Sequence, residues 1–185
     1  MNTELSRLID DAGAVSQNVD QLFGELSGRQ LNWKSEPSAW SIAQCLEHLI
    51  ITNQLEFPAI RDAIRPEYDN PFWSRFPLLP AIFGRIMIWL FATESRRRVK
   101  APKMFQPSQS ELPKDIVKDF IGHQREVVDL LKQCSRLDID RIRIVSPVSN
   151  FITYSLRDAF RVLVGHEQRH LRQAIRVAES AGFPR

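Results

Sequence analysis

The 185-residue chain is poor in cysteine, with only Cys45 and Cys134. Two cysteines exclude a disulfide framework and a cysteine-based zinc knuckle, and their scarcity indicates a reduced, cytoplasmic setting. The chain also lacks a strong excess of charge, because 25 basic and 22 acidic residues give a formal net charge of +3. So small an excess does not argue for nucleic acid as a partner. Internal repeats and low-complexity tracts are absent as well, and we expect one domain over residues 1–185.

The sequence has no uninterrupted apolar run long enough to cross a bilayer, which takes about 20 residues. Its most apolar stretch, residues 76–92, contains Arg85 and has two prolines near its start. We interpret this stretch as a buried or dimer-facing helix and expect no membrane insertion. The basic flank at 94–103 leaves peripheral membrane contact as the alternative. Residues 1–13 are acidic without an apolar run, so we expect no signal peptide.

Hydrophobic periodicity predicts two long helices in the first half of the chain. Over residues 5–26, leucine, valine and alanine recur in steps of three and four, which places them in one stripe along a helix. Residues 27–40 contain glycine and proline and are predicted to form a loop. Ser41 and Gln44 then have the spacing of a capping box that begins the second helix. Pro58 is expected to end or kink this helix.

The second half of the chain predicts two more helices with an extended segment between them. Ser108 and Glu111 have a capping spacing, so we expect the third helix to begin there. Isoleucine and valine alternate with polar residues over 136–155, which indicates extended structure at one end of a bundle. The fourth helix is expected to begin after Ser155 and to stop near Gly182. These patterns predict an all-α, four-helix bundle with an additional apolar helical segment and long connections.

Four histidines are present, and two of them share one face of the fourth helix. His166 and His170 are four residues apart, so their side chains lie roughly 6 Å apart and can reach one ion. They can equally be surface residues that happen to share a face. A stable metal site normally needs a third protein ligand, and the candidates are His48 and His123. His48 is flanked by apolar residues, and burial favours the neutral imidazole that a metal requires. We interpret His123, which lies among polar neighbours, as a partly exposed residue.

Three neighbours of these histidines have simpler interpretations than metal binding. Glu167 points about 100° away from His166 around the helix, so we expect a solvated surface carboxylate. Cys45 lies one turn before His48 and is close enough to touch an ion, but a small buried thiol is the commoner role. Trp40 precedes the second helix, and we expect it to anchor the core rather than to stack on a substrate.

The stretches "WSIAQCLEH" (residues 40–48) and "HEQRHLRQ" (166–173), in this order, resemble the DinB/YfiT-like superfamily over nearly the whole chain. The resemblance implies a four-helix bundle, often a homodimer, with a divalent metal held by three histidines. By position, His48, His166 and His170 match those ligands. Family members include transferases and isomerases that use low-molecular-weight thiols, and others were suggested to be metal-dependent hydrolases. The resemblance therefore implies a metal-dependent enzyme that acts on a small molecule.

Three imidazoles suit zinc or nickel, and such an ion activates a thiol cofactor or a water molecule. Gln173 is a candidate for orienting a ligand. Arg157 and Arg161 are candidates for binding an anionic substrate, but the simpler interpretation is that both are surface charges. The alternative function is a non-catalytic metal-binding or interaction protein, related to stress or DNA damage as the family name suggests. Against nucleic-acid binding, the basic cluster has a single nearby aromatic residue and is interpreted as a solvated loop; its members are Arg96, Arg97, Arg98, Lys100 and Lys103.

Overall fold

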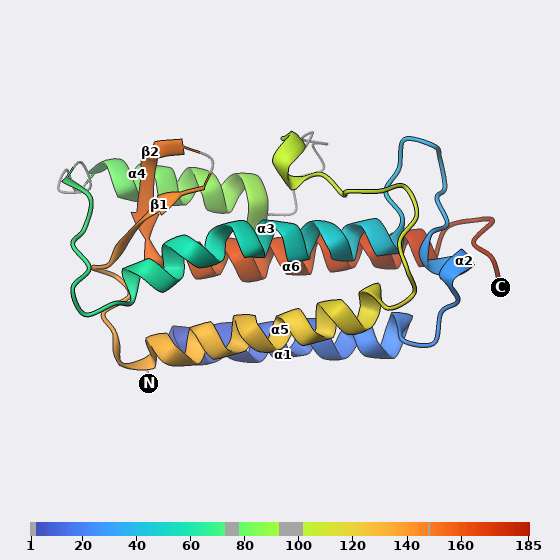
Figure 1. The fold of residues 1–185 in the computed structure, drawn as a ribbon, viewed down its shortest axis with the longest axis horizontal. Coiled ribbons are helices and arrows are strands. Elements are labelled where there is room, and N and C mark those ends of the chain that lie inside the picture. Colours follow the sequence, from blue (N-terminus) through green and yellow to red (C-terminus); the bar gives the residue numbers. More distant parts are fainter. Residues whose placement is uncertain (1–2, 73–77, 93–101, 148) are drawn as a thin grey trace.

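Within the described residues, four long helices lie side by side along the molecule (Figure 1): α1 (Thr3–Phe23), α3 (Ile42–Ala63), α5 (Ile116–Gln133) and α6 (Leu156–Ala178). This computed structural model describes every residue except 1–2, 73–77, 93–101 and 148. Each long helix makes most of its contacts with two of the other three, in the cyclic order α1, α5, α3, α6. The all-α, four-helix bundle expected from the sequence is therefore confirmed.

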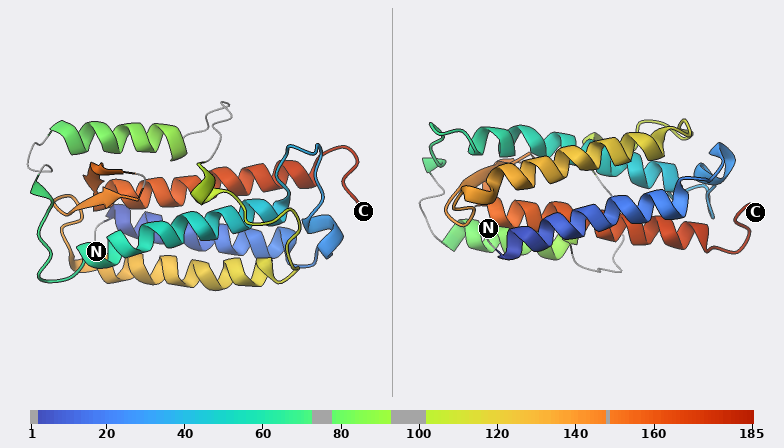
Figure 2. Two further views of the ribbon diagram at one scale, coloured as in Figure 1. Left: turned by 45° about the horizontal axis from the view of Figure 1, so that its top comes forward. Right: turned by 90° about the horizontal axis from the view of Figure 1, so that it is seen from below.

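Short elements cover the ends and one side of the bundle (Figure 2). An antiparallel hairpin of β1 (Arg143–Ser146) and β2 (Ser149–Ser155) confirms the extended structure predicted for residues 136–155. The apolar segment forms α4, which continues as a π-helix and contacts both β2 and α6. The segment's two elements are α4 (Leu78–Met87) and the π-helix η2 (Ile88–Ala92). The other short elements are α2 (Gly28–Leu31) and the 3₁₀ turns η3 (Lys103–Phe105) and η4 (Cys134–Arg136).

The start of α3 is fixed by the capping box that the sequence predicted. The Ser41 hydroxyl accepts a hydrogen bond from the backbone N–H of Gln44 at 3.2 Å, and the Gln44 side-chain oxygen accepts one from the N–H of Ser41 at 3.3 Å. Two otherwise unpaired backbone donors are thereby satisfied. Pro58 was predicted to end or kink this helix; it does not end it, because α3 continues through Pro58 to Ala63.

Replacing Ser41 with alanine should lower the free energy of unfolding by about 1 kcal/mol, because a lost N-cap leaves a backbone donor without its partner. The effect should appear as a lower urea midpoint. Ser16 lies inside α1, where it caps no helix. The control Ser16→Ala should therefore change the stability by less than about 0.5 kcal/mol. Equal losses in the two variants would contradict this role for Ser41.

The expected start of α5 is wrong. Ser108 caps no helix; its hydroxyl and its N–H both donate to the carboxylate of Glu47 on α3. The helix begins only at Ile116, after Asp115, which makes no side-chain cap. Pro113 gives a physical reason, because the residue before a proline is disfavoured in helical conformation. The chain therefore crosses to α3 first and turns into α5 after the proline.

The last helix begins as predicted and ends earlier than predicted. The Ser155 hydroxyl accepts from the N–H of Asp158 at 3.0 Å and so caps α6. The helix stops at Ala178, four residues before Gly182, whose φ of +88° belongs to a turn beyond the helix. The positive φ explains why glycine stands there. This position does not explain where the helix ends.

The apolar segment is buried on one face only. On its inner face, Gly84 packs so closely on α6 that an added Cβ would lie 2.4 Å from the Asp158 carboxylate. The outer face exposes Ile82, Ile86 and Trp89 by 51%, 44% and 54%. Of the two alternatives predicted for this segment, a buried helix does not describe its outer face, and a dimer-facing helix stays a prediction. Across the described residues, every helix falls short of the length and apolar character needed to cross a membrane.

The bundle core consists of two apolar clusters, one at each end. The first includes Phe57 and Phe160, and the second includes Phe23 and Phe120. The first cluster takes the N-terminal halves of α1 and α6 and the C-terminal halves of α3 and α5, so the two pairs of helices run in opposite directions. Where the two clusters meet, the buried side chains are polar.

Candidate metal centre

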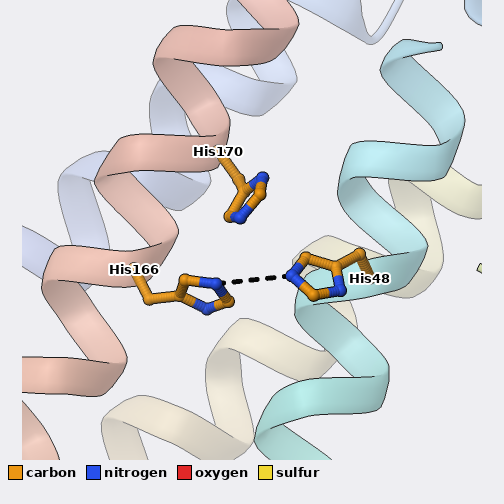
Figure 3. Close-up of side chains that lie close together, drawn as sticks. All are labelled: His48, His166 and His170. Atoms are coloured by element: carbon orange, nitrogen blue, oxygen red, sulfur yellow. Dashed lines mark hydrogen bonds between the residues drawn. The ribbon is translucent and has the colours of Figure 1, made fainter. Parts of the chain in front are cut away.

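Helices α3 and α6 bring three histidines to one point inside the bundle (Figure 3). His48 lies on α3, and His166 and His170 lie one turn apart on α6. The Nε2 atoms of His48 and His166 are 3.3 Å apart. One ring nitrogen from each of the three residues lies within 4.8 Å of those of the other two. The sequence placed these three residues in one site, and the structure brings them together.

The His48 ring is oriented by a backbone carbonyl. Its Nδ1 lies 2.5 Å from the carbonyl oxygen of Phe105, in the 3₁₀ turn η3. A carbonyl oxygen can only accept, so Nδ1 carries the hydrogen and Nε2 presents a lone pair to the other two histidines. Bonds of this kind fix the tautomer and the ring orientation of metal-binding histidines. The η3 turn therefore holds the His48 ring with its Nε2 towards the other two histidines.

Burial keeps all three imidazoles neutral. Burial lowers the pKa of His48, and the hydrogen bond to the Phe105 carbonyl partly opposes this shift. Burial also holds the pKa of His166 well below its ordinary value, and the charges of His170, His48 and Arg169 add to the effect. For His170, burial and then the charges of His48 and Arg169 lower the pKa to about 3, with the side chain of Gln173 opposing. Neutral imidazoles are the form that coordinates metals.

Two observations test whether the three residues fit a metal ion. Two nitrogens bound to one tetrahedral zinc at 2.0–2.1 Å are separated by about 3.3 Å, which is the separation found between His48 and His166. In addition, the Nδ1 atom of His170 is buried and has no hydrogen-bond partner among the described residues. A buried polar atom without a partner is costly unless a ligand satisfies it. The three residues fit a divalent ion on both counts.

Aromatic rings border the three histidines on two sides. Trp40 stacks on His170 with the ring centroids 5.7 Å apart and also lies 4.7 Å from the His48 ring. Phe91, from η2, meets the His166 ring edge-on at 6.0 Å. Trp40 is half-buried and packs on the second cluster of the core, as expected for an anchor, and it packs on the candidate ligands as well. The apolar segment thus contributes a wall of the site.

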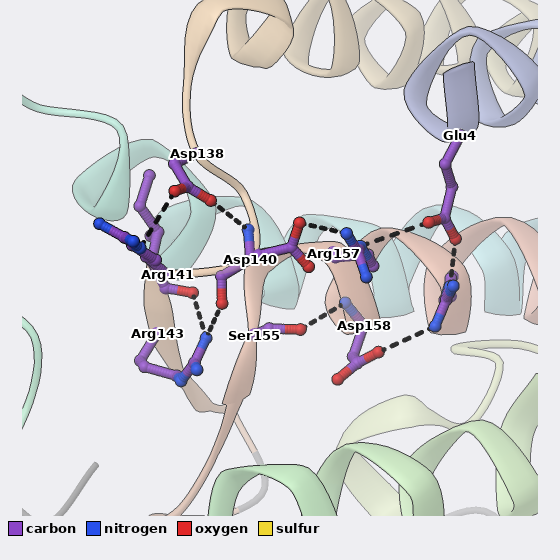
Figure 4. A network of polar contacts seen from close by, with 10 residues as sticks. Glu4, Asp138, Asp140, Arg141, Arg143, Ser155, Arg157 and Asp158 are labelled. Atoms are coloured by element: carbon purple, nitrogen blue, oxygen red, sulfur yellow. Dashed lines mark hydrogen bonds and ion pairs between the residues drawn. The ribbon is translucent and has the colours of Figure 1, made fainter. Parts of the chain in front are cut away.

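The two arginines considered for substrate binding form ion pairs elsewhere, as Figure 4 shows for Arg157. Arg157 pairs with Asp140 and lies 3.3 Å from Glu4 of α1. Arg161 pairs with the same Glu4 carboxylate. Both guanidinium groups therefore hold α6 against α1 and the loop before β1. They are not directed at the histidines.

Arg169 is the charged residue that the sequence analysis missed. Its guanidinium donates to the backbone carbonyl of Leu90 in η2 at 2.8 Å. Its charge contributes to the lowered pKa values of His166 and His170. The signal was present in the sequence, because Arg169 lies between the two histidines on α6. The site therefore has a fixed positive charge beside it.

Two of the interpretations made from the sequence are wrong. Glu167 is not a solvated carboxylate, because it is 0% exposed. His123 is buried as well, and its ring stacks on Phe57 with the centroids 5.1 Å apart. It lies outside the group of three ligand candidates. Cys45 is a small buried thiol as expected, and burial raises its pKa to about 12.

Acid should destabilise the metal-free protein through His170. Its pKa is lowered to about 3 in the folded state, whereas an unfolded histidine titrates near 6.5. The unfolded state therefore binds more protons, and stability is lost as the pH falls below about 6.5. In chelator-treated protein, we expect the free energy of unfolding to fall more steeply between pH 6.5 and 4.5 than in His170→Asn. The extra slope should approach about 1.4 kcal/mol per pH unit.

The comparison with His170→Asn separates the contribution of this histidine to the pH dependence of stability from that of groups with the opposite effect. Burial raises the pKa values of Glu56 and Glu167 to about 7, so both carboxyls stabilise the folded state as the pH falls from about 7 towards 4.5. Both proteins contain these two residues, and their contribution cancels in the difference. Urea unfolding at several pH values measures the slopes. Identical slopes in the two proteins would contradict the burial of a neutral His170.

Comparisons with known proteins agree with this fold. Among solved structures, the chain is similar to YfiT from Bacillus subtilis, described as "a probable metal-dependent hydrolase with an unusual four-helix bundle topology". The two share 15% sequence identity and a TM-score of 0.58, with 100% of this chain and 91% of that chain covered. At this identity the likeness shows the fold alone. No curated protein matches the sequence significantly. The family model of the DinB superfamily matches residues 13–174, and the chain therefore belongs to that superfamily.

Proposed function

We propose that the protein is a metal-dependent enzyme that acts on a small molecule, with His48, His166 and His170 as the ligands of a divalent ion. The observation that carries the proposal is the convergence of three buried, neutral imidazoles whose ring nitrogens lie within 4.8 Å of one another. Three protein ligands are the number typical of catalytic zinc sites, which keep a further position for water or substrate. Three imidazoles suit zinc and nickel.

A divalent ion bound by these residues would act as a Lewis acid and lower the pKa of a water molecule or thiol that binds to it. The residues of the chain orient the ligands and shield the site. The Phe105 carbonyl holds the His48 ring in place, and the rings of Trp40 and Phe91 keep water from two sides of the site. Exclusion of water strengthens every electrostatic interaction within a site. We therefore propose a site built for a small organic molecule with an apolar part.

The charge beside the site favours an anionic ligand. The guanidinium of Arg169 is held by Leu90, and its charge reaches both histidines of α6. A fixed positive charge stabilises a thiolate or another anion more than the neutral form of the same group. This supports a low-molecular-weight thiol, or a water molecule that loses a proton, as the group activated at the centre. The chemistry is thus thiol transfer or hydrolysis.

The test is a substrate screen with protein purified without an affinity tag and loaded with zinc or nickel. One arm offers low-molecular-weight thiols with electrophilic acceptors, and the other offers esters and amides without thiol. We expect turnover in one arm, and we expect its loss after chelation and in His166→Ala. Turnover that survives both chelation and His166→Ala would contradict the proposal. Dependence of the rate on added thiol separates transfer from hydrolysis.

We propose further that the protein is a cytoplasmic homodimer. The exposed outer face of α4 and η2 supports a dimer, because Ile82 and Ile86 of α4 and Trp89 of η2 follow one another at helical spacing on that surface. Two free, buried cysteines are consistent with a reduced compartment. Sedimentation should give twice the chain mass for the wild type and a lighter species for Ile86→Arg. A wild type that sediments as a monomer would contradict the dimer.

A further inference from the structure

A layer of buried polar side chains separates the two apolar clusters of the core. It contains Asn53 of α3, Gln124 of α5 and Glu167 of α6, each exposed by no more than 1%. On each of these helices, residues of one apolar cluster precede the polar residue and residues of the other cluster follow it. Burying three polar groups in a core is costly unless they are paired with one another.

Glu167 is the centre of this layer. Its Oε1 accepts a hydrogen bond from the Asn53 amide at 2.7 Å, and its Oε2 accepts one from the Gln124 amide at 3.1 Å. The same Gln124 nitrogen donates to the backbone carbonyl of Ala12 on α1 at 3.3 Å. The carboxyl group therefore links α6 directly to α3 and α5, and Gln124 extends the network to α1. A paired polar group in an apolar core can fix the register of the helices that carry it.

This link lies directly beside the candidate metal ligands. Glu167 follows His166 by one residue and precedes His170 by three, so along α6 it lies about 1.5 Å and 4.5 Å from them. Asn53 is five residues, or about 7.5 Å, beyond His48 on α3. The contact between Asn53 and Glu167 thus spans the same pair of helices as the contact between His48 and His166. A rotation or slip of α6 that broke one contact would move the other.

We infer that Glu167 is a positioning residue for the metal centre: held by Asn53 and Gln124, it fixes the rotation and axial register of α6 so that His166 and His170 face His48. The inference rests on the proposed metal function. Among the described residues, Glu167 makes no hydrogen bond to a nitrogen of the three candidate ligands, so its role would be indirect. The ligands on α6 are one turn apart, so a small rotation of the helix carries both away together.

Glutamine in place of Glu167 is the sharpest substitution, because it keeps the shape and removes one acceptor. Both neighbours present NH₂ groups to the carboxylate. The glutamine amide would place its own NH₂ against one of them, so one of the two contacts is lost. Metal sites need their ligands within about 0.5 Å of the productive geometry. Loss of a group that orients a single metal ligand typically weakens metal binding 10- to 100-fold, and we expect an effect of similar size here, because a displaced α6 would move two ligands together.

The test is a competition titration of zinc against a chromophoric chelator, with the full chain. We expect Glu167→Gln to raise the dissociation constant for zinc about 10- to 100-fold. Asn53→Ala, which removes a single partner of the carboxyl, should raise it less and keeps the inference testable if Glu167→Gln does not fold. Zinc affinities equal to the wild type in both variants would overturn the inference.

Glu56→Gln is the matched control. Glu56 is also a carboxyl with a pKa raised by burial to about 7, and it accepts hydrogen bonds from the Tyr154 hydroxyl at 3.2 and 3.3 Å. It lies eight residues beyond His48 on α3, about 12 Å along the helix. We expect Glu56→Gln to change stability and to leave the zinc affinity within about threefold of the wild type. An equal loss of affinity in Glu56→Gln would mean that any buried carboxyl has this effect and would overturn the assignment.

A second readout requires no metal. Crystal structures of the two metal-free variants give the separation of the His48 and His166 Nε2 atoms, 3.3 Å in the present structure. We expect this separation to widen by more than about 0.5 Å in Glu167→Gln and to stay unchanged in Glu56→Gln. If the wild type bound no zinc, the proposed function would fail while this measurement still decided the positioning role. An unchanged separation in Glu167→Gln would overturn that role.

Discussion

Replacing His48 or His166 with alanine should remove stoichiometric metal from the protein and leave its helix content largely intact. Each substitution deletes one of three proposed ligands, and two imidazoles do not make the three-ligand site that a catalytic ion needs. We expect the metal content measured by elemental analysis to fall at least about tenfold. Far-UV circular dichroism should stay close to that of the wild type, because both apolar clusters of the core remain.

His123→Ala is the control for this prediction. His123 is as deeply buried as the other histidines and stacks on Phe57, but it lies outside the group of three. Its replacement should lower the stability and keep the metal. Normal metal content in His48→Ala or His166→Ala would show that the ligands are assigned wrongly, whatever the behaviour of His123→Ala.

Phe120→Ala should have the largest effect on stability, a loss of about 3–5 kcal/mol in the free energy of unfolding. The Phe120 ring on α5 is fully buried in the second apolar cluster, where it packs with residues of the other three long helices. Truncation leaves a cavity that close-packed neighbours fill only in part. Urea unfolding of metal-free protein gives the value directly.

The matched substitution for Phe120→Ala is Phe151→Ala. Phe151 lies on β2 and is 82% exposed, so its loss should change the stability by less than about 0.5 kcal/mol. Comparable losses in the two variants would contradict the account of the core.

A bundle held by its apolar clusters does not need a metal ion to fold. Unfolding on chelation would therefore favour a structural metal over the proposed enzyme.

Local sequence signals predicted the starts of helices where one side chain decides them. Ser41 and Ser155 cap α3 and α6 as expected, because a serine hydroxyl at that position satisfies a nearby backbone donor. Ser108 carried the same local signal, yet its hydroxyl bonds to Glu47 on another helix. A contact between residues 61 positions apart overrides the capping preference, and such a contact is invisible to a local pattern.

The site shows the same limit. The spacing of His166 and His170 and the family resemblance together gave all three members of the group. Glu167 was wrongly predicted to be solvated, because only one face of α6 was expected to be buried. In the structure α6 contacts α1, α3, α4 and η2, so several of its faces are covered. Glu167 is therefore buried although it points away from the histidine face.

Four members of the basic cluster, Arg96, Arg97, Arg98 and Lys100, lie outside the described residues. A salt titration of binding to duplex DNA tests the nucleic-acid alternative independently of the structure, because the affinity of phosphate-binding proteins falls steeply with salt. Our account expects no salt-sensitive retention on DNA. Such retention would favour the interaction protein over the enzyme.

X-ray absorption spectroscopy of the zinc-loaded protein, purified without an affinity tag, tests the central claim most directly. The account predicts three imidazole nitrogens at about 2.0–2.1 Å from the ion and one further light atom. It also predicts no sulfur, because the Cys45 thiol is buried, with a pKa raised to about 12, outside the group of three. In thiol-free buffer, fewer than three imidazoles, or a sulfur neighbour at about 2.3 Å, would contradict it.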